Sequence, residues 1–222
     1  VVLRRLHFKD AAQVVEEFGV SAPLLGALWD LGLSSDQINR GEGFSFRDLD
    51  SPLSMRQDPD QELTASEVVN LTDEKDLADL IYRNSDERMS RRIAASIVRL
   101  RPLASVGDLV EAVTKSLPRG YRNRDDVLRR TLQAIRMEVN EELPQLTRSL
   151  GDILERMAPG GRMVVLSYHS GEDGLTKRFF RQAKLDGKVR ILTPKPLRPM
   201  PDEVRDNPRA RPAHLRAVEV IG

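Results

Sequence analysis

The sequence contains no cysteine and has few histidine and aromatic residues. Of its 222 residues, three are histidine and 5% are aromatic. The absence of thiols excludes disulfide bonds, thiol catalysis and zinc sites with cysteine ligands. Three scattered histidines, at positions 7, 169 and 214, also argue against a transition-metal site built from protein side chains. Any catalysis must therefore use other groups.

Long apolar runs are also missing. No stretch approaches the roughly 18 to 20 consecutive apolar residues that cross a bilayer, and the N-terminus lacks the charged and apolar regions of a signal peptide. We therefore expect a cytoplasmic protein with no membrane partner. With 40% hydrophobic residues, the chain can bury a core of ordinary size. Its length of 222 residues fits either one large domain or one domain that carries an insertion.

The net charge of +1 conceals a strong sorting of charges along the chain. Residues 57–80 hold one lysine and eight acids, a net charge of −7. Residues 83–136 hold thirteen bases and six acids, and residues 174–222 hold twelve bases and five acids, +7 in each case. The two basic regions could form one surface for a polyanion such as nucleic acid, although solvated helix faces are the alternative.

Both ends of the chain have an α/β pattern. The order of apolar residues predicts a strand over 1–8, a helix over 9–18 and a buried strand over 24–30, which delivers Asp30 to its C-terminal end. Open α/β sheets bind ligands at such ends. Near the C-terminus the pattern predicts the following elements: a helix to Met157, a turn at 158–161, a strand over 162–167, a helix through Lys177 and Phe180, a loop over 194–208 and a strand over 213–221.

In the middle of the chain, the residue pattern predicts a loop and helices but no strand. Residues 41–59 are rich in Gly, Ser, Asp and Pro, which indicates an ordered loop. Five helices are then expected: one that starts at Thr64, a second that starts at Thr72 with a capping box, and three over 85–100, 105–116 and 125–149. Because no strand intervenes, we predict an α/β domain formed by residues 1–40 and 141–222, interrupted by a loop and helical domain at 41–140.

Several short segments together resemble the MraW-type family of small-subunit rRNA cytosine-N4 methyltransferases. These segments are Asp30-Leu-Gly-Leu-Ser-Ser35, Gly43-Phe-Ser-Phe46, Arg130-Thr-Leu-Gln-Ala-Ile-Arg136 with Val139-Asn-Glu141, Ala158-Pro-Gly-Gly161, Ser167-Tyr-His-Ser170 and Asn207-Pro-Arg-Ala-Arg211. The resemblance implies a Rossmann-like S-adenosylmethionine methyltransferase domain with an inserted all-helical domain. It also implies methylation of the N4 amine of a cytosine in the decoding region of 16S rRNA, with that rRNA or the small ribosomal subunit as partner.

The resemblance implies a donor pocket that contains Phe8, Asp30 and Gln37. Methylation of an exocyclic amine needs an acceptor near the amine hydrogens, and Asp30 at a strand end is the catalytic candidate. A capping or turn carboxylate is the alternative for Asp30. For Phe8 the alternative is core packing, because aromatic residues are usually found in cores.

A second set of polar residues is expected to contact substrate or RNA. The set is Ser34, Ser35, Arg136, Asn140, His169, Lys177, Arg178, Arg209 and Arg211. The alternatives are a capping turn for the two serines, an inter-domain contact for Arg136 and Asn140, and a loop-bracing role for His169. For the other basic residues, and for Arg181, phosphate contact is favoured over base readout.

The sequence also departs from the family pattern. The glycine-rich turn that would hold most of the donor is not found, so the methyltransferase domain is expected to be N-terminally incomplete and to bind the donor weakly. The alternative function is therefore an inactive fragment or paralogue that binds rRNA without methyl transfer. A domain without its first strands would expose a sheet edge, which predicts self-association, with a homodimer as one outcome.

Overall fold

The computed structural model describes residues 3–4, 6–19, 22–34, 37 and 42–221. The chain forms two compact units. The α/β unit comprises Val1–Gly32 and Leu143–Gly222, and the helical unit comprises Leu33–Glu142. The domain boundaries expected at residues 40 and 140 differ from these bounds by a few residues and stay a prediction.

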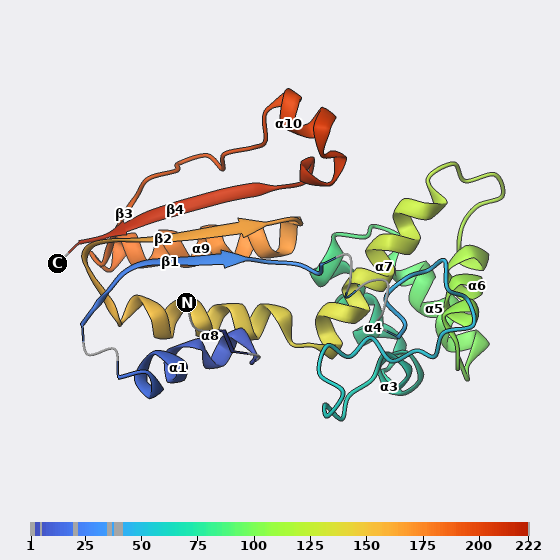
Figure 1. Ribbon diagram of the computed structural model, residues 1–222. Coiled ribbons are helices and arrows are strands. Elements are labelled where there is room, and N and C mark those ends of the chain that lie inside the picture. The colour runs from blue at the N-terminus through green and yellow to red at the C-terminus, as the bar shows by residue number, and fades with distance from the viewer. Residues whose placement is uncertain (1–2, 5, 20–21, 35–36, 38–41, 222) are drawn as a thin grey trace. The chain divides into compact units, whose positions relative to one another are not determined.

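A four-stranded sheet forms the centre of the α/β unit (Figure 1). Its strands are β1 (Leu24–Asp30), β2 (Met157–Ser167), β3 (Val189–Ile191) and β4 (His214–Val220), in the order β1-β2-β4-β3. The pair β1 and β2 is parallel, whereas β4 runs antiparallel to both of its neighbours. The expected α/β class is therefore confirmed, and so is the strand that ends at Asp30.

Helices cover one face of this sheet. They are α1 (Ala11–Glu17), α8 (Glu142–Leu154) and α9 (Ser170–Leu185). Their apolar side chains share one core with Trp29, Met163 and Val218, which register places on the same face of the sheet. The Trp29 indole also donates a 2.9 Å hydrogen bond from Nε1 to Ser149 Oγ on α8, so its buried N–H is satisfied.

The opposite face of β1 is exposed, so the expectation of a buried strand is wrong for this face. Leu28 on this face is 70% exposed, whereas Trp29 on the helix-covered face is 7% exposed. In the described part of the chain β1 pairs only with β2, so its other edge has no strand partner. A continuous apolar run usually marks a parallel strand covered on both faces. The residues of β1 form such an apolar run, but helices cover only one face of this strand.

The expected turn at residues 158–161 lies inside β2 as a break in register. Met157 pairs with Leu24 and Arg162 pairs with Gly26, so the intervening residues of β2 bulge out. Gly161 is required there, because a Cβ atom would lie 2.8 Å from the Ala158 carbonyl oxygen. The glycine therefore allows β1 and β2 to resume their pairing toward Asp30.

Two local predictions for the α/β unit are wrong. The described residues before Phe8 form no strand, and a short 3-10 turn, η1 (Phe8–Asp10), leads into α1 instead. The segment expected to be loop, 194–208, contains α10 (Pro201–Asp206), and the 3-10 turn η2 (Pro208–Ala210) begins at its last residue. Prolines begin both elements, and a first helical turn tolerates proline because its N–H groups have no intrahelical partner. The short strand β3 was not predicted.

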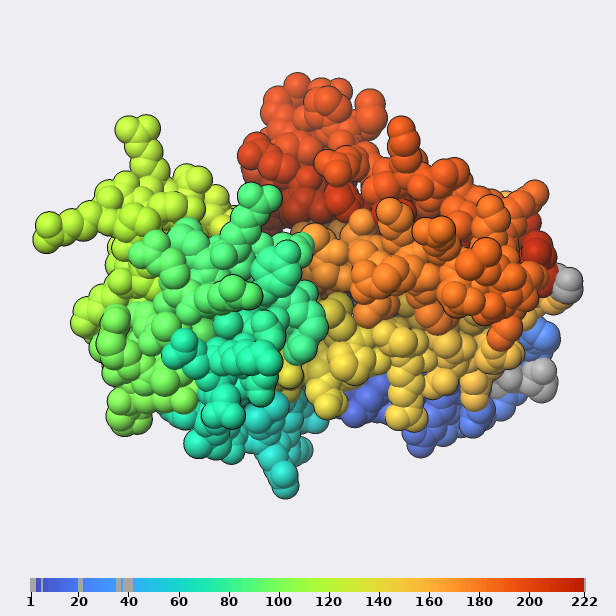
Figure 2. Space-filling view, turned by 180° about the vertical axis from the view of Figure 1, so that it is seen from behind, coloured from blue at the N-terminus to red at the C-terminus, as the bar shows by residue number. Residues whose placement is uncertain are grey.

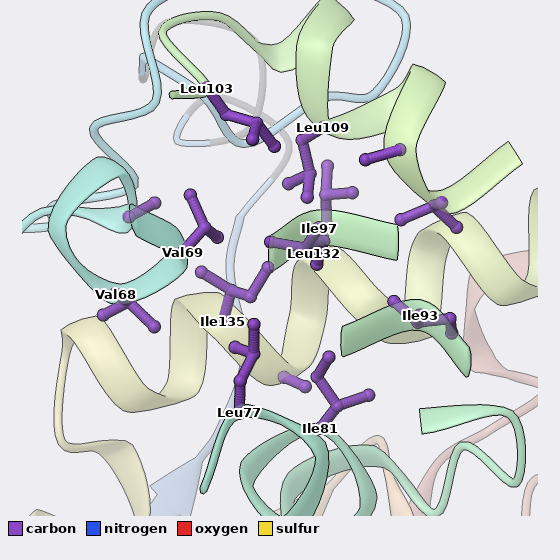
Figure 3. Packing of buried hydrophobic residues seen from close by; sticks show 14 of the residues in the cluster. Val68, Val69, Leu77, Ile81, Ile93, Ile97, Leu103, Leu109, Leu132 and Ile135 are labelled. Carbon is purple, nitrogen blue, oxygen red and sulfur yellow. The ribbon is translucent and has the colours of Figure 1, made fainter. Parts of the chain in front are cut away.

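Among the described residues 42–141, the helical unit contains a loop and five helices. They surround a core of their own, part of which is seen in Figure 3. The helices are α3 (Ala65–Leu71), α4 (Glu74–Ser85), α5 (Ser90–Leu100), α6 (Val106–Ser116) and α7 (Arg124–Val139). Apolar residues three or four positions apart, such as Leu77 and Ile81 of α4 or Ile93 and Ile97 of α5, point into this core. Within the described residues, no helix is both long enough and apolar enough to cross a membrane.

Capping boxes begin two of these helices. Thr64 with Glu67 and Ser105 with Asp108 exchange the reciprocal bonds of a capping box. The box expected at Thr72 is wrong, because Asp73 is the N-cap of α4 and makes no side-chain cap hydrogen bond. The local pattern at Thr72 thus marks the start of a helix correctly but not the residue that caps it.

The helix expected over 125–149 is divided in two. It is interrupted at Asn140, whose side chain donates to the carbonyl oxygens of Met55 and Arg136 and accepts from Gln57 N, each at 2.8 Å. The next residue, Glu141, has a φ of +48°. The break is therefore tied to a buried amide that holds the preceding loop, a contact between positions far apart in the sequence.

A buried ion pair joins α9 to β4. Asp173 accepts hydrogen bonds of 2.7 and 2.9 Å from Arg216, and His214 Nδ1 lies 3.5 Å from the same carboxylate. Burial raises the pKa of Asp173, but the Arg216 bonds and charge, followed by His214, outweigh this effect, so the pKa falls below its ordinary value of 3.8. The bidentate geometry is the strong form of this contact.

We expect Arg216→Met to lower the free energy of unfolding by about 2 kcal/mol near neutral pH, because it leaves the largely buried Asp173 carboxylate with only His214 beside it. Since the folded-state pKa of Asp173 is depressed, the pair stabilises the fold above pH 3.8 and loses its contribution as the pH falls through the folded value. Urea unfolding at neutral pH and at about pH 3 measures both effects. Arg190→Met, which removes an exposed pair with Glu219, is the control. A difference from wild type that does not shrink in acid would contradict this assignment.

The exposed edge and face of β1 predict self-association. An unpaired apolar strand edge is a template for pairing with another chain. Leu28→Lys should therefore shift the sedimentation distribution toward monomer, whereas Leu185→Lys, at a residue 72% exposed on α9, should not. A wild-type chain that stays monomeric at all concentrations would contradict the prediction.

Candidate functional site

The C-terminal ends of β1 and β2 bring two polar side chains together. Asp30 pairs in register with Leu166, so Tyr168 follows close to it on the neighbouring strand. The Tyr168 hydroxyl donates a 3.0 Å hydrogen bond to Asp30 Oδ1. The chain then leaves β1 through Gly32, whose φ of +98° requires glycine. The site thus lies where an open α/β sheet binds its ligands.

Tyr168 keeps its proton in this position. Burial raises its pKa, and the hydrogen bond to Asp30 and the negative charges of Asp30, Glu172 and Glu203 raise it further. The phenol is therefore a fixed donor to the carboxylate near neutral pH. Asp30 itself is exposed, so its second carboxylate oxygen can accept a hydrogen bond from a ligand.

The first turn of α9 begins beside this pair. His169 is the N-cap of α9, and its Nδ1 accepts from the backbone N–H of Glu172. The Glu172 carboxylate, which is buried, accepts a 3.1 Å bond from the Tyr168 backbone N–H. His169 Nε2 lies 3.0 Å from Glu172 Oε1 but lacks the alignment of a hydrogen bond. His169 and Glu172 thus fix the backbone that carries Tyr168.

Phe8 packs against apolar residues rather than against this polar cluster. Its ring is partly buried against the apolar core of the α/β unit. This is the core contact that the sequence left open as the alternative. A donor-binding role for Phe8 stays a prediction.

Ser34 and Gln37 form a reciprocal capping arrangement in the helical unit. Gln37 Oε1 accepts a 2.8 Å bond from Ser34 N, and Ser34 Oγ accepts a 3.2 Å bond from Gln37 N. This is the capping turn expected as the alternative for the serines. Ser35 lies outside the described residues. Donor contact by Gln37 stays a prediction.

Arg136 and Asn140 make polar contacts inside the helical unit. Arg136 binds Glu142 through two hydrogen bonds of 2.7 and 2.9 Å, and both side chains are largely buried. Asn140 holds the loop at Met55 and Gln57. These contacts account for both residues structurally, and their proposed role in substrate binding stays untested.

The other basic candidates lie on the surface of the α/β unit. Lys177 and Arg178 are exposed on α9, and Arg181 is exposed one turn further along. Arg209 and Arg211 are exposed in and after η2, within the segment that protrudes from this unit at the top of Figure 2. The arrangement leaves their charges accessible to a polyanion.

Sequence reasoning missed the roles of Tyr168 and Arg216. Tyr168 stands in a quoted motif, but only the pairing of β1 with β2 places its hydroxyl against Asp30. A signal was available, since a polar aromatic residue directly after a strand beside Asp30 could have been considered as its partner. For Arg216, the apolar neighbours on β4 gave no indication of a buried ion pair with Asp173.

The sequence matches the MraW methylase family over residues 1–221. A relative from Synechococcus elongatus, named ribosomal RNA small subunit methyltransferase H, is 46% identical over 198 residues, which cover 88% of this chain and 66% of the relative. Proteins of the same name from Heliobacterium modesticaldum and Rhodopirellula baltica are 39% and 45% identical, over 100% and 86% of this chain and 77% and 60% of their own lengths.

The chain thus spans about two thirds of the length of the curated relatives that it resembles. The match nevertheless includes both strands that carry the Asp30 and Tyr168 pair, as well as the helical unit. By sequence over nearly its whole length, this chain is a member of the MraW methylase family.

Proposed function

We propose that this chain takes part in S-adenosylmethionine-dependent methylation of the N4 amine of a cytosine in the decoding region of 16S rRNA. The α/β unit is assigned to the Rossmann-like methyltransferase domain and the helical unit to its insertion. The observation that carries the proposal is the Asp30 carboxylate, which is exposed at the end of β1 and held on one side by Tyr168. The names of the relatives support a small-subunit rRNA substrate.

The chemistry explains why a carboxylate is useful there. The cytosine amine is a weak nucleophile because its lone pair is conjugated with the ring. A carboxylate that accepts an amine hydrogen directs the lone pair toward the sulfonium methyl. As the N–C bond forms and the C–S bond breaks, the carboxylate stabilises the positive charge that develops on the nitrogen and accepts its proton. Tyr168 occupies Oδ1 and fixes the orientation of Asp30, so the other oxygen faces the substrate amine.

Of the three predicted donor contacts, Asp30 has the clearest fit to the methyl donor. S-adenosylmethionine supplies an electrophilic methyl group on a positively charged sulfonium, which a nearby carboxylate stabilises. Asp30 is exposed and anionic, whereas the Phe8 ring packs against the core and Gln37 Oε1 is used by Ser34. We therefore assign Asp30 to both donor and amine, and expect weak donor binding by this chain.

RNA binding is assigned to the exposed basic side chains of the α/β unit. These are Lys177, Arg178 and Arg181 on α9, and Arg209 and Arg211 after α10. Their positive charges are not arranged to recognise particular nucleobases. Such groups bind phosphates and position a nucleic acid rather than read its sequence.

We expect Asp30→Asn to slow methyl transfer by about 100-fold or more, because it removes the acceptor for the amine hydrogen. Tyr168→Phe should slow it by about tenfold, because the carboxylate keeps its charge but loses a fixed hydrogen bond. The measurement is single-turnover transfer of labelled methyl from S-adenosylmethionine to small ribosomal subunits that lack the modification.

Thr147→Ala, at an exposed hydroxyl on α8, is the control and should retain full activity. Filter binding of 16S rRNA should stay unchanged in all three variants. Calorimetric titration with S-adenosylmethionine separates the two functions: rRNA binding without donor binding or turnover would favour an RNA-binding relative. Full turnover by Asp30→Asn would remove Asp30 from the mechanism.

We further expect the double variant Lys177→Ala, Arg178→Ala to bind rRNA more weakly and with a lower salt dependence. Loss of two phosphate contacts should reduce the slope of log K against log salt by about 1.4, at about 0.7 per charge. Lys188→Ala with Arg190→Ala is the matched control, because these two cations are paired with Glu155 and Glu219. An unchanged slope in the first variant would place the RNA elsewhere.

A further inference from the structure

The helical unit carries a groove that the proposed methyl transfer does not use. The groove has a volume of about 510 Å³ and lies over α3, α4 and the last turn of α7. A volume of this size accommodates one or two large side chains of a partner. It is lined by apolar residues at its floor and lip and by acidic residues around them.

The apolar part of the groove includes two exposed leucines. Leu71, the last residue of α3, is 76% exposed, and Leu63 is 39% exposed. The floor beside them contains Val68 and Leu80, which are 4% and 5% exposed. A single exposed leucine is ordinary, but two at the lip of an apolar depression form a surface for an anchoring side chain.

The acidic residues that line the groove outnumber the basic ones. Asp76 and Asp79 are exposed on α4 three residues apart, and neither makes an ion pair within the described residues. Hydrogen bonds from the Thr64 backbone and hydroxyl lower the pKa of Glu67, so this carboxylate stays anionic. Arg83 also lines the groove, but its guanidinium pairs with Glu138 at 3.2 Å.

This combination of charge and apolar surface selects the occupant. Anionic groups repel the phosphates of RNA, whereas an apolar floor gives no advantage to a free metal ion or a polyamine. We propose that the groove is a docking site for a basic segment of another protein, with lysine or arginine residues around one aliphatic anchor that packs against Leu71 and Leu63. The inference goes beyond the proposed methyl transfer and does not depend on it.

The test uses a fluorescein-labelled amphipathic peptide of lysine and alanine with one central leucine. Two comparison peptides carry serine in place of the leucine, or glutamate in place of the lysines. Fluorescence anisotropy with the full chain should show micromolar binding of the first peptide only. Binding should weaken as salt is added, because the charges lie at the surface.

Variants then assign the site. Asp76→Lys should weaken peptide binding by about fivefold or more, and Leu71→Ser by about tenfold, as the charge and the apolar contact are lost. Glu74→Lys is the matched control: it makes the same charge change in the first turn of α4, about 200° around the helix from Asp76, and should leave binding unchanged.

Leu71 is an exposed residue, so its replacement preserves the fold, and circular dichroism melting checks this for each variant. Equal weakening by Asp76→Lys and Glu74→Lys would overturn the site. Equally tight binding of the serine peptide would show general charge attraction and would overturn the apolar anchor. Binding of a labelled rRNA fragment to the wild-type chain that is lost in Leu71→Ser would assign the surface to nucleic acid instead.

Discussion

The parallel pairing of β1 with β2 is the constraint on which the candidate site depends. It sets Asp30 opposite Leu166, and therefore sets the Tyr168 hydroxyl against the Asp30 carboxylate. A shift of one residue in this register would turn Asp30 toward the helices on the other face of the sheet. The bulge at Gly161 and the cap at His169 serve the same register, one before the paired segment and one after it.

Each unit has its own apolar core, and buried polar contacts fix how the elements around each core are arranged. In the α/β unit, Trp29 binds Ser149 and Asp173 binds Arg216, so buried polar groups tie helices to strands. In the helical unit, the Asn140 amide holds the loop that precedes α3. Such buried contacts favour one arrangement of helices and strands over others. In any other arrangement, a buried polar group would lose its hydrogen-bond partner and its desolvation free energy would not be recovered.

The charges that are sorted along the sequence also lie on different surfaces of the folded units. The acidic region of residues 57–80 includes α3 and the first part of α4, and its Glu67, Asp76 and Asp79 line an apolar groove. The C-terminal basic region places Lys177 and Arg178 in solvent on α9. An enzyme that meets RNA together with its bound basic proteins would have use for both kinds of surface, since each recognises a polymer of opposite charge.

The sequence by itself determined what depends on neighbouring residues. It predicted β1 with its end at Asp30, the last strand, most helices, the helix start at Thr64 and the family, because periodicity, helix-start signals and short motifs are local. Only the tertiary structure decided which apolar strand is covered on one face, where the helix after Asp125 breaks, and that Tyr168 and Arg216 find carboxylate partners. These outcomes depend on contacts between residues distant in the chain, and no local pattern encodes them.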